Sequence, residues 1–176
     1  MPTPAPFSAV ASEVFMQHVR DSCLRPFTTL YYTVGLVEEA SELAEQLTAQ
    51  PAPDTALVLS EVGDCLWYLW AVCNSLTDVH PVMSHEAKGV GSVEAGGLEA
   101  LLLARCGALC GAVKKWSRGD QSWEVFLPRL QAGVTALLDL LAVISPAPLE
   151  LAMQGNIEKI RSRRERGVVR GDGNTR

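Results

Sequence analysis

The feature that most constrains this chain is a set of acidic residues inside the otherwise apolar segment Gly35–Trp70, GLVEEASELAEQLTAQPAPDTALVLSEVGDCLWYLW. Its carboxylates interrupt helical patterns of apolar residues at Glu38, Glu39, Glu42, Glu61 and Asp64. No Lys or Arg occurs between Arg25 and Lys88. Burying a carboxylate without a cationic partner is very costly, so these side chains must be solvated, protonated or bound to a metal ion.

Two carboxylate pairs share one spacing, Glu39-x-x-Glu42 and Glu61-x-x-Asp64. Residues three apart lie on one face of an α-helix, with Cβ atoms about 5–6 Å apart, so each pair points two carboxylates at a common place. The first predicted helix has an apolar side next to its acidic side. The second is apolar almost all round, which is typical of a buried helix.

The connection Thr48–Asp54, TAQPAPD, predicts that these two helices are antiparallel neighbours. Its two prolines end the first helix, and Asp54 is suited to cap the second. A short connection makes the two helices pack side by side. Glu42 and Glu61 lie equally far from its centre, so at about 1.5 Å rise per residue both pairs return to the same height. Four carboxylates then face one another, and an all-oxygen set of this kind suits Mg²⁺ or Mn²⁺.

A plainer interpretation is a solvated acidic face with helix-capping acids. We adopt it for Glu45 and Asp54. It fits Glu61 and Asp64 poorly, because they are set among apolar residues in LSEVGDCLWYLW. For Glu38 three roles stay open: support of a metal ligand, a general base, or plain exposure.

The composition predicts an all-α protein. The 176 residues suffice for one domain with a core, 48% are hydrophobic and 6% aromatic, and no alternating Val/Ile/Thr stretch argues for a sheet. We expect about five helices in one bundle, with residues 1–7 as a flexible lead, 8–166 as the single domain and 167–176 as a Gly/Arg-rich tail. Residues 77–97 are expected to form a loop over the site rather than a metal site, despite His80, His85 and Glu86.

The chain is expected to be cytoplasmic and without a membrane span. Five cysteines without a CxxC pair favour a reducing cytosol over a disulfide framework. The N-terminal residues show neither the basic nor the apolar region of a signal peptide. Polar residues interrupt the apolar runs before they reach the roughly 20 residues of a membrane span.

Two stretches resemble a known family. GLVEEASELAEQL followed by SEVGDCLWYLW is similar to the paired ExxE and ExxD motifs of the MazG-like, all-α nucleoside triphosphate pyrophosphohydrolases. The closing segment NIEKIRSRRERGVVRGDGNTR resembles the end of a subgroup of these proteins. ExxE alone is common on any helix, whereas both pairs together with GD-x-LWYL and this closing segment are specific. The resemblance covers about Tyr31–Trp70 and Asn156–Arg176.

The resemblance implies a helical bundle that forms a homodimer or a dimer of dimers. It implies hydrolysis of a (d)NTP to a (d)NMP and pyrophosphate, as in the house-cleaning of nucleotide pools. The site residues that it implies are Mg²⁺ ligands at Glu39, Glu42, Glu61 and Asp64, a glutamate that assists a second metal or activates water at Glu38, and phosphate contacts at Asn156, Lys159 and Arg163.

The residues themselves are consistent with this chemistry. An acidic pocket repels a triphosphate unless cations intervene, and Mg²⁺ (or Mn²⁺ as a substitute) would reverse the local charge and lower the pKa of a water molecule. Glu38 is our candidate general base. Basic side chains would neutralise the leaving pyrophosphate, namely Lys115, Lys159 and Arg163. No P-loop motif is present. Trp67 or Trp70 could stack on a base, although core packing is favoured.

Three other classes of protein compete with this one. A di-metal redox bundle would need Glu-x-x-His, which none of the predicted helices contains. A non-catalytic helical protein could bind nucleotides or nucleic acid through the basic C-terminal region, which holds six arginines and a lysine from Lys159 onward, but this leaves the carboxylates unexplained. A family member that binds nucleotides without hydrolysis is disfavoured because all four implied metal ligands are present.

Overall fold

The computed structural model describes residues 9–22, 28–76 and 97–168. These residues form helices and no strands, so the expected all-α class is confirmed. The helices are α1 (Ala9–Ser22), α2 (Thr29–Thr48), α3 (Thr55–Leu76), α4 (Leu98–Ser117), α5 (Trp123–Ile144) and α6 (Leu149–Glu165). The described residues thus hold six helices where we expected about five. Residues 1–7, His80, His85, Glu86 and most of the expected 77–97 loop and 167–176 tail lie outside the described residues.

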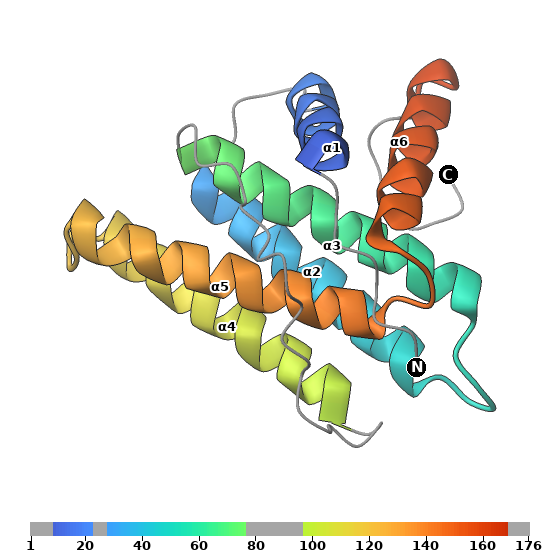
Figure 1. The fold of residues 1–176 in the computed structure, drawn as a ribbon, viewed down its shortest axis with the longest axis horizontal. Helices are drawn as coiled ribbons and strands as arrows, with labels where there is room; N and C mark the ends of the chain where they lie inside the picture. Colours follow the sequence, from blue (N-terminus) through green and yellow to red (C-terminus); the bar gives the residue numbers. More distant parts are fainter. Residues whose placement is uncertain (1–8, 23–27, 77–96, 169–176) are drawn as a thin grey trace.

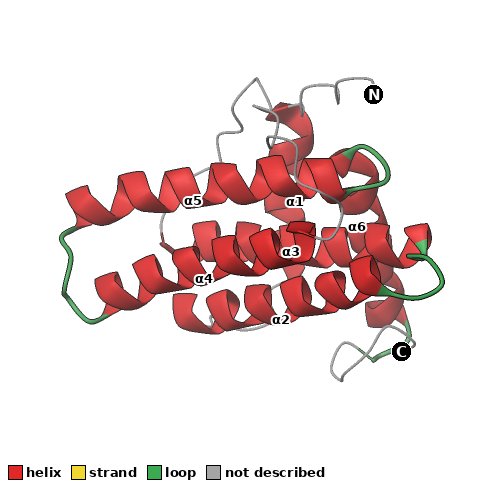
Figure 2. Cartoon of the chain, turned by 90° about the horizontal axis from the view of Figure 1, so that it is seen from below, coloured by secondary structure: helices red, strands yellow, loops and turns green. Residues whose placement is uncertain are grey.

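The four long helices α2, α3, α4 and α5 form a bundle, and α1 and α6 lie across α3 on one side of this bundle (Figure 1). The same grouping is visible from below in Figure 2. Helix α2 packs against α3 on one side and against α4 on the other, and α4 pairs with α5. Helix α6 contacts both α3 and α1. Helix α3 is therefore the element that the acidic helix and the two crossing helices share.

Local chemistry explains where the two acidic helices begin. The Asp54 carboxylate accepts hydrogen bonds from the backbone N–H of Ala56 at 2.8 Å and of Leu57 at 3.3 Å, which confirms its predicted capping role. In α2 the side chain of Thr28 accepts from the N–H of Tyr31 at 3.4 Å. These caps satisfy backbone donors that have no partner inside the helix.

The hydrophobic core is centred on α3, as its apolar composition predicted. Leu66, Leu69 and Trp70 are fully buried, and the core continues into the facing sides of the other helices. Trp70 is therefore a packing residue. Trp67 is half-buried and its indole N–H donates to the hydroxyl of Ser22 at 2.7 Å. Burial of an aromatic or aliphatic side chain of this size stabilises the fold by roughly 1.5–3 kcal/mol.

Among the helices that the structure describes, two are long and apolar enough to cross a membrane, by length and composition only: α3 and α5. In α3, 67% of the most apolar window is buried inside the protein, and in α5 39% is buried. The role of α3 as the central core helix accounts for its composition. The expectation of a cytoplasmic protein stays a prediction.

Gly63 sets the distance between α3 and α6. A Cβ atom on Gly63 would lie 2.6 Å from the backbone oxygen of Ala152 and 3.3 Å from Cβ of Asn156. We expect Gly63→Ala to lower the unfolding free energy by about 1–3 kcal/mol, because a backbone atom of α6 must move away. Urea denaturation measures this change.

Gly155 provides the matched control for that substitution. It lies in α6, and a Cβ atom there would meet nothing within 4 Å. Alanine forms helices better than glycine by about 1 kcal/mol, so Gly155→Ala should leave the unfolding free energy unchanged or raise it. Equal losses in the two variants would contradict the close approach of α3 and α6 at Gly63.

Candidate metal centre

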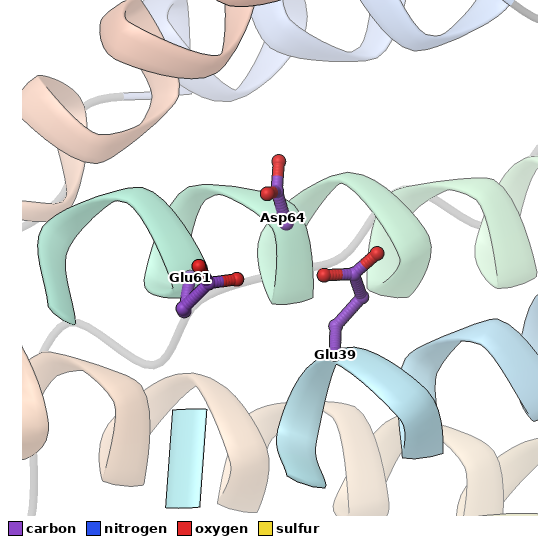
Figure 3. A group of neighbouring side chains, drawn as sticks. All are labelled: Glu39, Glu61 and Asp64. Atoms are coloured by element: carbon purple, nitrogen blue, oxygen red, sulfur yellow. The ribbon is translucent and has the colours of Figure 1, made fainter. Parts of the chain in front are cut away.

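Three carboxylates come together at the α2–α3 seam, and we call Glu39, Glu61 and Asp64 the carboxylate cluster. One oxygen of each lies within 4.8 Å of the others. In Figure 3 the Glu39 side chain reaches from α2 toward α3, where Glu61 and Asp64 lie about one turn apart. Glu61 is 1% exposed, and the side chain of Asp64 is 13% exposed. Helical i,i+3 spacing places the two α3 acids on one face, as the sequence predicted.

Burial and the neighbouring acidic groups raise the pKa of Glu39, so that it stays protonated at a pH where an exposed glutamate is ionised. The pKa of Glu39 is raised from 4.5 to about 8, and burial is the largest cause. The negative charge of Asp64 adds to the rise, and those of Glu42 and Glu61 follow. The Lys159 ammonium opposes it. Near neutral pH, the Glu39 carboxyl therefore holds a proton that a bound cation would displace.

Helix α6 supplies the polar partners of Asp64. The Asn156 side-chain N–H donates to Oδ1 of Asp64 at 2.6 Å. The Lys159 ammonium forms an ion pair with Oδ2 of Asp64 and a hydrogen bond to the hydroxyl of Ser60 at 3.3 Å. Because Asn156 and Lys159 are three apart, both project from one face of α6 toward α3. Both oxygens of Asp64 are thus oriented from the same neighbouring helix.

A histidine from α1 completes this network. Nε2 of His18 lies 3.2 Å from Oδ1 of Asn156, a residue that is 4% exposed. This contact could not be predicted from the sequence, because a lone histidine in an amphipathic helix is typical of an exposed or packed residue.

The carboxylate cluster does not include the other two predicted acids. Glu42 and Glu38 are both exposed on α2. Glu42 is close enough to raise the pKa of Glu39 but is not one of the three converging carboxylates. The side chain of Glu38 points in a different direction from that of Glu39, because consecutive residues on a helix do not face the same way. Its role as a general base stays a prediction.

The predicted basic residues fall into two groups. Lys159 contacts the cluster, and Arg163 lies about one turn further along the same face of α6, half-buried. Lys115 is exposed in the last turn of α4. The Cys110 thiol on α4 contacts the carbonyl of Thr33, near the start of α2. Because α4 runs antiparallel to α2, Lys115 lies still further toward the start of α2, away from Glu39. The structure therefore does not bring Lys115 to the carboxylate cluster.

Two contacts of this site, those of Ser60 and His18, were not predicted from the sequence. Ser60 lies four residues before Asp64, so helical spacing would have found it as a neighbour on the same face. His18 carries no such signal, because its partner is 138 residues away in the sequence.

The donor set fits a small divalent cation. Adjacent ligand atoms of an octahedral Mg²⁺ ion lie roughly 3.0 Å apart and opposite ones roughly 4.2 Å, given metal–oxygen distances of about 2.1 Å. The three converging oxygens lie within 4.8 Å of one another, so side-chain movements that shift each oxygen by about an ångström would bring them into coordination. Carboxylate oxygens are the ligands that Mg²⁺ and Mn²⁺ prefer. The geometry thus permits a metal site made of Glu39, Glu61 and Asp64.

No protein-family model, curated protein or solved structure matches this chain. The interpretation of the site therefore depends on its geometry and on the sequence motifs.

Proposed function

We propose that this protein is a Mg²⁺-dependent nucleoside triphosphate pyrophosphohydrolase, which cleaves a (d)NTP into a (d)NMP and pyrophosphate. The single observation that carries the proposal is the convergence of Glu39, Glu61 and Asp64 from two antiparallel helices onto one small, buried space. The motif resemblance supplies the reaction class. Homodimers or dimers of dimers in the cytoplasm belong to the same proposal, which includes no nucleic-acid or membrane partner.

Burial of the cluster supports a ligand-binding role over a purely structural one. Asp64 is paired with Lys159, but burying the further acidic groups of Glu39 and Glu61 beside it costs free energy, so a fold without use for them would gain from apolar replacements. The raised pKa of Glu39 is the sign of such a cost. Perturbed carboxyl groups that converge in this way are typical of functional sites.

The chain's own residues divide the work among three helices. Glu39, Glu61 and Asp64 would hold Mg²⁺, which when bound supplies positive charge to the phosphates and acidifies a water molecule. Asn156 donates to Asp64 and keeps that carboxylate in place. The Lys159 ammonium stands beside the same carboxylate and can turn from Asp64 to a phosphate oxygen, because its side chain is long and flexible.

Lys159→Met tests this division of roles. The ammonium competes with a cation for Asp64, so its removal should leave Mn²⁺ affinity unchanged or tighter. Turnover of the triphosphate should fall by about 10- to 100-fold, because phosphate charge is no longer balanced. Calorimetric Mn²⁺ titration and steady-state kinetics check the two effects. Loss of Mn²⁺ binding in this variant would show that Lys159 builds the metal site instead.

The proposed reaction is tested with a panel of canonical and modified NTPs and dNTPs. Each is incubated with the protein and Mg²⁺, and the products are separated by chromatography. We expect a monophosphate and pyrophosphate from at least one nucleotide, and no products in EDTA. Glu45→Gln, which changes an exposed acid of α2, should behave as the wild type.

Three other outcomes would replace the proposal. Release of orthophosphate and a diphosphate would mean that a different bond is cleaved. If no nucleotide of the panel is hydrolysed but Mg²⁺ still binds, the non-catalytic nucleotide-binding protein would be favoured. A salt-sensitive nucleic-acid complex that persists in EDTA would favour nucleic-acid binding by the exposed arginines in the last turns of α6 and at its C-cap, Arg161, Arg164 and Arg166.

A further inference from the structure

The contact between His18 and Asn156 lies near the carboxylate cluster and has no role in the proposed function. His18 on α1, Asn156 on α6 and Asp64 on α3 form a chain of two hydrogen bonds. The distances are 3.2 Å from Nε2 of His18 to Oδ1 of Asn156, and 2.6 Å from Nδ2 of Asn156 to Oδ1 of Asp64. Asn156 is buried and His18 is half-buried, so the chain links three helices through the interior.

The direction of each hydrogen bond in this chain follows from the chemistry of its ends. An ionised carboxylate only accepts, so the Asn156 amide must present its N–H to Asp64. The amide carbonyl then faces His18, and a carbonyl also only accepts. Nε2 of His18 must therefore carry the hydrogen.

The protonation of His18 agrees with this direction. Burial is the main cause of a lowered pKa for His18, while its hydrogen bond with Asn156 opposes the change. The imidazole is therefore neutral near pH 7 and carries one hydrogen. With this hydrogen on Nε2, the Nδ1 atom is left as an acceptor.

We propose that His18 is a positioning residue whose Nε2–H holds the Asn156 amide in the orientation that donates to Asp64, and thereby fixes this carboxylate for a divalent cation. The cation part rests on the proposed function, whereas the orientation of Asn156 does not. The terminal torsion of an asparagine has two broad, nearly equivalent wells, so the amide needs a second partner to select one of them. A flipped amide would place its oxygen against an oxygen of Asp64.

The alternative is that His18 only packs. Its ring lies 5.7 Å from that of Phe15, which is an ordinary contact between aromatic rings. Two substitutions separate packing from hydrogen bonding. His18→Phe keeps an aromatic ring and loses the donor, whereas His18→Gln loses the ring and keeps an N–H that can reach the amide oxygen.

The first experiment needs no metal ion. Long-range ¹H–¹⁵N correlation spectra of the full-length wild type at pH 7.5 report which ring nitrogen of each histidine carries the hydrogen, and the His18→Phe spectrum assigns the signal of His18. We expect the Nε2–H tautomer. The Nδ1–H tautomer would overturn the proposal, since it could not donate to Asn156.

The second experiment measures Mn²⁺ affinity by calorimetry, without nucleotide. Loss of a group that orients a metal ligand typically weakens binding by 10- to 100-fold, so we expect a Kd about 10-fold higher in His18→Phe. His18→Gln should stay within about 3-fold of the wild type. Circular dichroism should show equal helix content in all three proteins.

The outcomes separate this proposal from the proposed function. Equal Mn²⁺ affinity in the wild type and His18→Phe would assign His18 to packing and overturn the proposal. Weak binding in His18→Gln with strong binding in His18→Phe would do the same. If the wild type itself binds no Mn²⁺, the proposed function fails and so does the cation part of this inference, while the tautomer still decides whether His18 orients Asn156.

Discussion

Glu61→Gln is expected to abolish Mg²⁺-dependent turnover while the helical bundle stays folded. Glu61 is 1% exposed and is one of the three converging carboxylates. Glutamine has nearly the same shape but is a weak metal ligand, so activity should fall by at least about 100-fold, more than the loss of an outer partner causes. Removing the acidic group of Glu61 also relieves its repulsion with the neighbouring acids of the cluster, so the unfolding free energy should be unchanged or higher. Product assays and urea denaturation of the same preparation measure both effects.

The control for this variant is Glu45→Gln, which removes one carboxylate from the exposed side of α2. It should retain both activity and stability. Asp64→Asn is a less informative choice, because it also disturbs the ion pair with Lys159 and the hydrogen bond from Asn156. If Glu61→Gln unfolds, or stays as active as Glu45→Gln, the buried glutamate is structural and the metal centre is wrongly assigned.

The metal-free protein is expected to lose stability as the pH rises from about 5 to about 8. Glu39 has an ordinary pKa of 4.5 and a pKa of about 8 in the folded protein. Between these values the folded state binds more protons than the unfolded state, so the unfolding free energy falls with pH. The slope from this one group is at most about 1.4 kcal/mol per pH unit. Urea denaturation in EDTA at several pH values measures it.

Glu39→Gln isolates this contribution because the variant cannot ionise at that position. The variant and the wild type should be similarly stable near pH 5, and the variant should be the more stable near pH 8. Added Mg²⁺ should stabilise the wild type more at pH 8 than at pH 6. At pH 8 a smaller fraction of Glu39 is protonated, so Mg²⁺ has fewer protons to displace. Parallel pH profiles for the two proteins would show that Glu39 titrates normally and is not confined in a buried cluster.

The fold was largely predictable because its signals are local. The period of the apolar residues, the prolines of the α2–α3 connection and the Asp54 cap each act within a few residues, and the structure agrees with all three. The pairing of α2 with α3 followed from the short connection. The positions of α1 and α6 across α3 could not be predicted in this way, because they depend on contacts between residues far apart in the sequence, such as the close approach at Gly63.

The site was predictable in part for the same reason. Helical spacing identified Glu61 and Asp64 as neighbours and placed Glu39 opposite them. It could not show that Glu42 is exposed, because a residue three positions from Glu39 can share its face and still reach solvent. The link from His18 through Asn156 arises where three helices meet, which no periodicity encodes.

The most direct test of the metal centre is an anomalous-scattering map from crystals of the protein grown with Mn²⁺. We expect a peak between α2 and α3, within coordination distance of carboxylate oxygens of Glu39, Glu61 and Asp64. A map without a peak at this place under saturating Mn²⁺, or with peaks only at other residues, would contradict the assignment.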